Sequence, residues 1–163
     1  MLIKHNNDFF IQWDTTYYLE NNLELGVFNF WIDDHAYPGK WTNITLIPLF
    51  NDLISNLEKI HNIKQDLGAI PLSQIDFSLN NDQLVNLDTG ELFQYGLGLS
   101  IGFDKNIERL FYTIDYGKSF SEIVLPKGTL INTLKSLRQF TSHHMYVIHQ
   151  LKCLCDKPFK MSC

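Results

Sequence analysis

Hydrophobic and polar residues alternate in short segments near the start of the chain, with the period of two expected for strands that bury one face. In DFFIQWD, one face would hold Phe9, Ile11 and Trp13 and the other Phe10, Gln12 and Asp14. Residues 27–32 are apolar at every position except Asn29, which predicts a central strand covered on both faces. A bend at residues 33–35 and a further strand at residues 42–47 complete this first run of strands.

The pattern then changes to a helical period. Pro48 suits the first turn of a helix, and the apolar positions that follow it at helical spacing are Leu49, Phe50, Leu53, Ile54, Leu57 and Ile60. Residues 61–92 are polar, rich in Asn and only weakly periodic. We therefore expect a connection there, with room for one short element.

The second half of the chain repeats the order of strands followed by a helix. Strands are predicted at residues 97–103, 108–115 and 120–125, and an amphipathic helix at residues 130–141. In the first of these strands, Gly98, Ser100 and Gly102 leave one face nearly bare, which predicts close packing by another element. Strands that come in runs indicate a single α+β domain with a mostly antiparallel sheet of about six strands and two main amphipathic helices.

The length of 163 residues fits one domain, which we place at residues 1–142, followed by a tail at residues 143–163. No signal peptide and no long apolar run is evident, so we expect a cytoplasmic protein that does not enter a membrane. The three cysteines, Cys153, Cys155 and Cys163, all lie in the tail, which favours reduced thiols.

The net charge of −5 argues against direct nucleic-acid binding and allows attraction to a cationic partner.

Candidate catalytic and metal-binding motifs lack the context that their chemistry requires. Ser100 lies in a Gly-x-Ser-x-Gly pattern, but the predicted strand leads into another strand and not into the helix of a nucleophile elbow. A zinc site would draw on His143, His144, His149, Cys153 and Cys155, whose spacing matches no standard finger or ribbon. We expect no catalytic residues, no bound metal and no cofactor. A small hydrolase, a metal-dependent enzyme and a non-catalytic adaptor stay as alternatives.

The segment TIDYGKSF, residues 113–120, resembles an Asp-box hairpin. The carboxylate of Asp115 would cap the turn, Gly117 would take a positive φ and Phe120 would pack against the hairpin. A single copy predicts a well-defined turn and needs no substrate to explain it.

A wider resemblance links both halves of the chain. An initial block that contains Trp13-Asp14, residues 26–30 (GVFNF), Asp33-Asp34, Tyr37-Pro38 and Thr45-Leu46 resembles the start of the immunity protein 42 family. The later segment LFYTIDYGKSFSEIVLPKGTL resembles the closing hairpin of that family, so the likeness spans about residues 8–140.

The resemblance implies a cytoplasmic bacterial antitoxin of polymorphic toxin and contact-dependent growth inhibition systems. Such a protein binds and blocks a cognate toxin domain without catalysis. The acidic charge favours a basic toxin, of which nucleases are the class we expect. We assign partner binding to the acidic bend Asp33-Asp34 together with Glu20 and Glu24, and we interpret the apolar residues of 27–32 as core.

Overall fold

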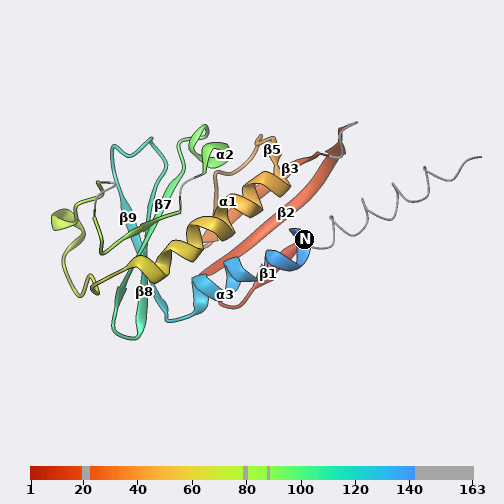
Figure 1. Ribbon diagram of the computed structural model, residues 1–163. Helices are drawn as coiled ribbons and strands as arrows, with labels where there is room; N and C mark the ends of the chain where they lie inside the picture. Colours follow the sequence, from red (N-terminus) through yellow and green to blue (C-terminus); the bar gives the residue numbers. More distant parts are fainter. Residues whose placement is uncertain (20–22, 79–80, 88, 142–163) are drawn as a thin grey trace, which may run out of the picture.

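The computed structural model describes residues 1–19, 23–78, 81–87 and 89–141 (Figure 1). The predicted tail, with its histidines and cysteines, lies outside these residues, and so does Glu20. The strands form two antiparallel sheets, and the main helices lie across one side of them.

The first sheet contains the early strands of the chain. Its members are β1 (Leu2–Lys4), β2 (Phe9–Tyr18), β3 (Glu24–Ile32), β4 (His35–Tyr37) and β5 (Ile44–Thr45). They pair in the order β1-β2-β3-β4, and β5 also pairs with β3. The strand predicted at residues 42–47 is shorter than expected because the following helix already begins at Leu46, which places Pro48 in its first turn.

The second sheet pairs β6 (Val85–Asn86), β7 (Gly98–Asp104), β8 (Ile107–Thr113) and β9 (Ser121–Pro126) in sequence order. The bare face of β7 is packed as predicted. A Cβ atom built on Gly102 would come within 2.9 Å of Leu84 and 3.1 Å of Leu67, so the connecting segment lies directly against this glycine.

Three α-helices and two short 3-10 helices occur among the described residues. They are α1 (Leu46–Glu58), η1 (Lys59–Asn62), η2 (Leu72–Gln74), α2 (Gly90–Phe93) and α3 (Thr129–Lys135). The region 61–92 thus holds more short elements than the single one expected. Figure 1 shows α1 and α3 side by side in front of the sheets. None of the helices in the described part of the chain is long and apolar enough to span a bilayer.

One hydrophobic core joins the helices to both sheets. Trp13 of β2 meets Phe50 of α1 edge to face, with ring centroids 5.4 Å apart, and the same indole meets Phe140 at 4.7 Å. The two sheets approach each other through Tyr37 and Tyr112, whose rings lie 5.4 Å apart. The predicted α+β class is confirmed, with the strands divided between two sheets.

The prediction that β3 is covered on both faces is wrong. Phe28 and Phe30 are buried against the helices, whereas Val27 and Trp31 on the opposite face are only half-buried. Trp31 is sheltered by the neighbouring strand, because its ring stacks on Phe10 at 5.4 Å and its Nε1 donates a hydrogen bond to Gln12. Such a cross-strand aromatic pair produces an apolar sequence pattern without a second covering layer.

Candidate functional site

The acidic bend joins β3 to β4 as a two-residue turn. Asp33 and Asp34 have φ values of 51° and 64°, and Ile32 pairs with His35 across the turn. Two consecutive positive φ values are typical of a type I′ hairpin, a conformation that aspartate tolerates better than most residues. The Asp33 N–H donates to the Asp8 carbonyl at 3.0 Å. This bond fixes the turn, and both side chains stay exposed to solvent.

Glu24 lies at the opposite end of the same strand. Its carboxylate accepts a hydrogen bond from the Thr15 hydroxyl at 3.3 Å. Since β3 runs from Glu24 to Ile32 at about 3.3 Å per residue, roughly 30 Å separates Glu24 from the acidic bend. The structure therefore does not bring Glu24 beside Asp33 and Asp34, and Glu20 lies outside the described residues.

The turn between β8 and β9 has the geometry predicted for an Asp-box hairpin. Asp115 accepts hydrogen bonds from the Ser119 hydroxyl at 2.6 Å, from the Ser119 N–H at 3.0 Å and from the Thr113 hydroxyl at 2.8 Å. These donors hold the pKa of the Asp115 carboxyl well below its usual range. Gly117 has a φ of 82°, and Phe120 stacks on Phe77 with ring centroids 3.8 Å apart. The structural interpretation of this motif is confirmed.

Four exposed apolar side chains belong to three segments that contact one another, and we call this group the aromatic edge. It consists of Trp41 in the loop before β5, Phe93 in α2, and Ile114 and Tyr116 in the β8–β9 turn. Trp41 is 95% exposed and has a φ of 69°. A left-handed backbone at a tryptophan costs on the order of 1 kcal/mol, so the surrounding structure has to hold it.

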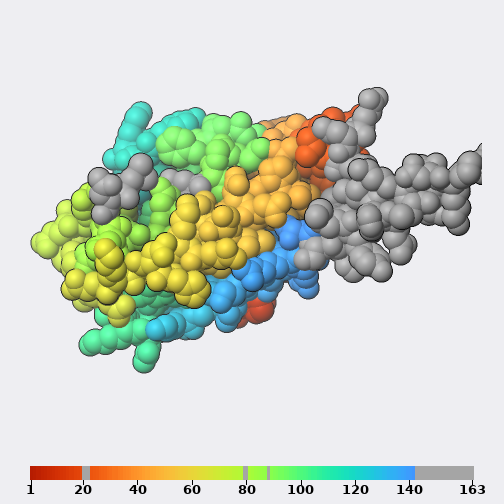
Figure 2. All heavy atoms as spheres, in the orientation of Figure 1, coloured from red at the N-terminus to blue at the C-terminus, as the bar shows by residue number. Residues whose placement is uncertain are grey.

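Direct contacts lock the three segments of the aromatic edge to one another. The Asn43 N–H donates to the Tyr95 hydroxyl at 2.9 Å, which ties the Trp41 loop to the segment just after α2. Phe93 meets Tyr116 edge to face at 5.7 Å, and the Tyr116 hydroxyl donates to the Gln94 carbonyl at 3.2 Å. Figure 2 shows the green α2 region between the cyan β8–β9 region and the orange start of α1.

The aromatic edge is not evident from the sequence alone. Trp41 was part of an aromatic-rich stretch, but it lies in a loop and belongs to no periodic pattern. The other members of the aromatic edge come from residues 93 and 114–116, and only the tertiary structure brings their segments into contact with the Trp41 loop, through Asn43 and Tyr95. The one signal in the sequence is a tryptophan directly after Pro38-Gly39-Lys40, a context that favours an exposed turn.

Two buried charged residues in β8, Glu108 and Arg109, were also not recognised from the sequence, and both stabilise the fold. Glu108 accepts hydrogen bonds from the Gly128 and Leu130 N–H groups, each at 2.7 Å, at the start of α3. Burial raises the pKa of the Glu108 carboxyl above its ordinary value, against the lowering effect of these N–H donors. In the sequence, Glu108 and Arg109 are visible only as part of residues 108–115, which predict a strand.

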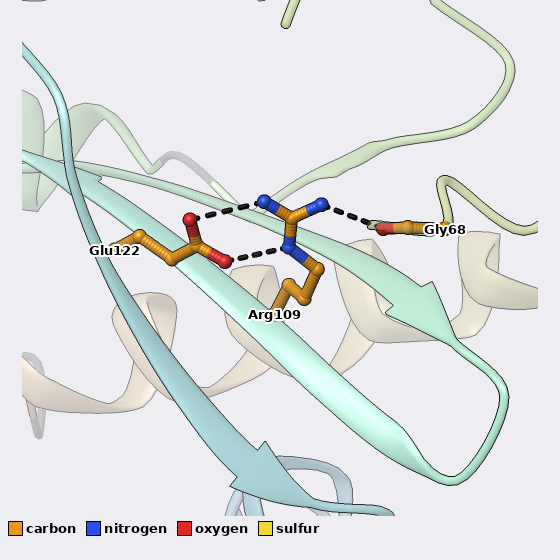
Figure 3. A network of polar contacts seen from close by, with 3 residues as sticks. All are labelled: Gly68, Arg109 and Glu122. Carbon is orange, nitrogen blue, oxygen red and sulfur yellow. Dashed lines mark hydrogen bonds and ion pairs between the residues drawn. The ribbon is translucent and has the colours of Figure 1, made fainter. Parts of the chain in front are cut away.

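The neighbouring Arg109 joins three parts of the chain (Figure 3). Its guanidinium binds both carboxylate oxygens of Glu122 in β9, at 2.5 and 3.0 Å, and donates to the Gly68 carbonyl at 2.6 Å. Every group in this network has a partner inside the chain, so the arrangement fastens the segment around Gly68 to the second sheet.

The catalytic alternatives gain no support from the geometry of the described residues. Ser100 lies in the middle of β7, paired with Phe111 and Asn86, and not at a strand-to-helix turn. In the described ranges, no group of three or more His, Cys, Asp or Glu side chains is placed to hold a metal ion.

Comparisons with known proteins agree with the α+β fold described above. A crystal structure of CdiI from Burkholderia dolosa AUO158 superposes with a TM-score of 0.59 at 15% sequence identity, covering 85% of this chain and 99% of that chain. This likeness shows a shared fold. No curated protein is significantly similar in sequence. The family model of immunity protein 42 matches residues 1–140, and the chain therefore belongs to the immunity protein 42 family.

Proposed function

We propose that this immunity protein neutralises its cognate toxin by direct, stoichiometric binding in the cytoplasm, without catalysis, within a contact-dependent growth inhibition system. The observation that carries the proposal is the family match over residues 1–140. The fold shared with CdiI, an immunity protein of such a system, supports the contact-dependent setting.

The toxin that we propose is a basic domain, with nucleases as the favoured class. The net charge of −5 supports this choice, because nuclease clefts that bind phosphates are basic and opposite charges accelerate association. Asp33 and Asp34 are well suited to this steering role. Their carboxylates are exposed on a rigid two-residue turn, so little conformational freedom is lost when a partner binds.

Glu24 and Glu20 form a second acidic position in the proposal. Because Glu24 lies at the far end of β3, it would contact a toxin only through a long interface or add to the general negative field. Glu20 stays in the proposal on its place in the sequence alone. Asp33 and Asp34 are therefore the residues to test first.

The test uses the toxin domain encoded upstream of the immunity gene. Wild type and an Asp33→Asn/Asp34→Asn variant are each co-expressed with the toxin, and association rates are measured with purified proteins at several salt concentrations. Asparagine tolerates the positive φ values of this turn, so the change removes charge while keeping the backbone. Asp52→Asn/Asp82→Asn is the control, since it removes the same charge from exposed positions elsewhere.

We expect the Asp33→Asn/Asp34→Asn variant to associate about tenfold more slowly at low salt and to lose most of that difference at high salt. The control should keep most of the wild-type rate. Equal rates for the two variants would overturn the assignment of the acidic bend. The proposed function would be overturned if the wild-type protein neither bound the toxin nor protected the cell from it. It would also be overturned if the wild-type protein inactivated a molar excess of toxin, because that would be catalysis.

A further inference from the structure

We propose that the aromatic edge is the anchor of the toxin complex, with Trp41 as the residue that contributes most to affinity. This inference rests on the proposed function, because the occupant to which it commits is the cognate toxin domain. It concerns a surface built from residues of three segments far apart in sequence, none of which is among the acidic residues considered above.

The first argument is the exposure of Trp41. The Trp41 side chain is 95% exposed, so it gains almost no burial of apolar surface when the free chain folds. The Trp41 backbone also lies in the strained left-handed region, with a φ of 69°. Its local geometry is therefore not explained by the core. Tryptophan is also the residue type most enriched at the energetic centres of protein interfaces, where burial of its large ring recovers the hydrophobic contribution.

The second argument is the rigidity of the support. The Asn43–Tyr95 hydrogen bonds hold the Trp41 loop, and the Phe93–Tyr116 ring contact holds the β8–β9 turn against α2. The turn itself is closed by Asp115, which accepts N–H groups of Lys118 and Ser119. Because these contacts already exist in the free chain, a partner would not have to order the loops, and less free energy is lost on binding.

The third argument concerns the chemistry of the partner. The apolar side chains of the aromatic edge have two exposed cations in the same segments, Lys40 beside Trp41 and Lys118 beside Gly117. The complementary toxin surface is an apolar pocket wide enough for an indole, with carboxylates at its rim opposite the two lysines. The acidic bend would then meet a basic region elsewhere on the same toxin.

These two surfaces make different kinetic contributions, and this separates them experimentally. Removal of charge at the acidic bend should slow association in a salt-dependent manner. Removal of the indole should accelerate dissociation at every salt concentration, because apolar burial is not screened by ions.

The experiment measures binding of the same upstream-encoded toxin domain, with its active site inactivated, to wild type, Trp41→Ala, Trp41→Phe and Val124→Ala. Val124 is the matched control, because it is an exposed apolar residue in β9 and not part of the aromatic edge. Thermal melting of each variant is recorded as well. Trp41→Ala should melt within about 2 °C of wild type, since the side chain has almost no contacts to lose.

We expect Trp41→Ala to weaken affinity at least about 30-fold through faster dissociation, Trp41→Phe to recover part of the loss, and Val124→Ala to bind as wild type does. If wild type binds the toxin and Trp41→Ala binds it with the same affinity, this inference is overturned while the proposed function stays intact. The inference would also be overturned if wild type formed a dimer that the Trp41→Ala substitution abolished, while toxin affinity stayed the same. The aromatic edge would then be an interface between two copies of this chain. Wild type that does not bind this toxin would instead overturn the proposed function.

Discussion

At the scale of single residues, the carboxylates of this protein have different roles that their shared chemistry does not reveal. The carboxylate of Asp115 accepts hydrogen bonds from the backbone of its own turn, and the carboxylate of Glu108 accepts them from the backbone at the start of α3. Asp33 and Asp34 have exposed side chains in a turn that is closed by backbone groups. For this reason we propose partner binding for the acidic bend, and we give a structural role to the other two carboxylates.

The contribution of Asp115 to the stability of the fold is predicted to depend on pH. The pKa of this carboxyl lies below its unfolded value of about 3.9, so its contribution to stability is present above that pH and is lost as the pH falls toward the folded value. Asp115→Asn removes the charge and should lower the melting temperature at pH 7. The difference from wild type should shrink as the pH falls below about 4, which melting curves between pH 3 and pH 7 would measure. A difference that grows toward acidic pH would contradict the role given to Asp115.

At the scale of elements, β8 connects α3, β9 and the segment around Gly68 through two buried charged side chains. Glu108 faces the start of α3, and Arg109 on the opposite face of the strand reaches β9 and the segment around Gly68. The positive φ of Gly128, 92°, permits the sharp entrance to the helix at which its N–H meets the carboxylate.

Substitution of Glu108 tests this connection. Glu108→Ala leaves the Gly128 and Leu130 N–H groups without their acceptor in a buried place, and we expect a loss of about 2–4 kcal/mol in the free energy of unfolding. Chemical denaturation provides the measurement. Glu122→Gln, which keeps most of the packing around Arg109, should cost less because Glu122 is more exposed to water. A near-neutral Glu108→Ala would refute the capping role.

At the scale of the whole molecule, α1 and α3 cover one side of two sheets (Figure 1). The exposed residues of the aromatic edge lie in α2 and in two loops. The core formed by the described residues ends with Phe140, which meets Trp13 at 4.7 Å. The family match ends at the same position, residue 140.

This agreement predicts that a chain truncated after residue 142 folds independently. We expect it to melt within about 3 °C of the full-length chain and to bind the upstream-encoded toxin domain with similar affinity, since the core and both candidate surfaces lie before that position. Calorimetry and a binding titration would measure the two quantities. A collapse in stability, or zinc that stays bound to the full chain through dialysis, would give the tail a structural role.

The sequence by itself determined the class of fold, the central position of β3, the helix with Pro48 in its first turn, the β8–β9 turn and the family. These features depend on local signals, namely the period of apolar residues, Pro and Gly at turns, and motifs that are continuous in the chain. The structural roles of Glu108 and Arg109 could not be recognised in this way. Their hydrogen-bond partners lie in α3 and β9, and these elements come next to β8 only in the folded protein.

The tertiary structure decided where the surface features lie. It placed Glu24 at the far end of β3 from Asp33 and Asp34, although these residues are close in sequence. It also brought the loop that contains Trp41 and Asn43 into contact with Tyr95, and Phe93 into contact with Tyr116, although these segments are far apart in sequence. A binding surface is assembled from loops whose positions depend on how the sheets and helices pack, and no local pattern encodes that arrangement.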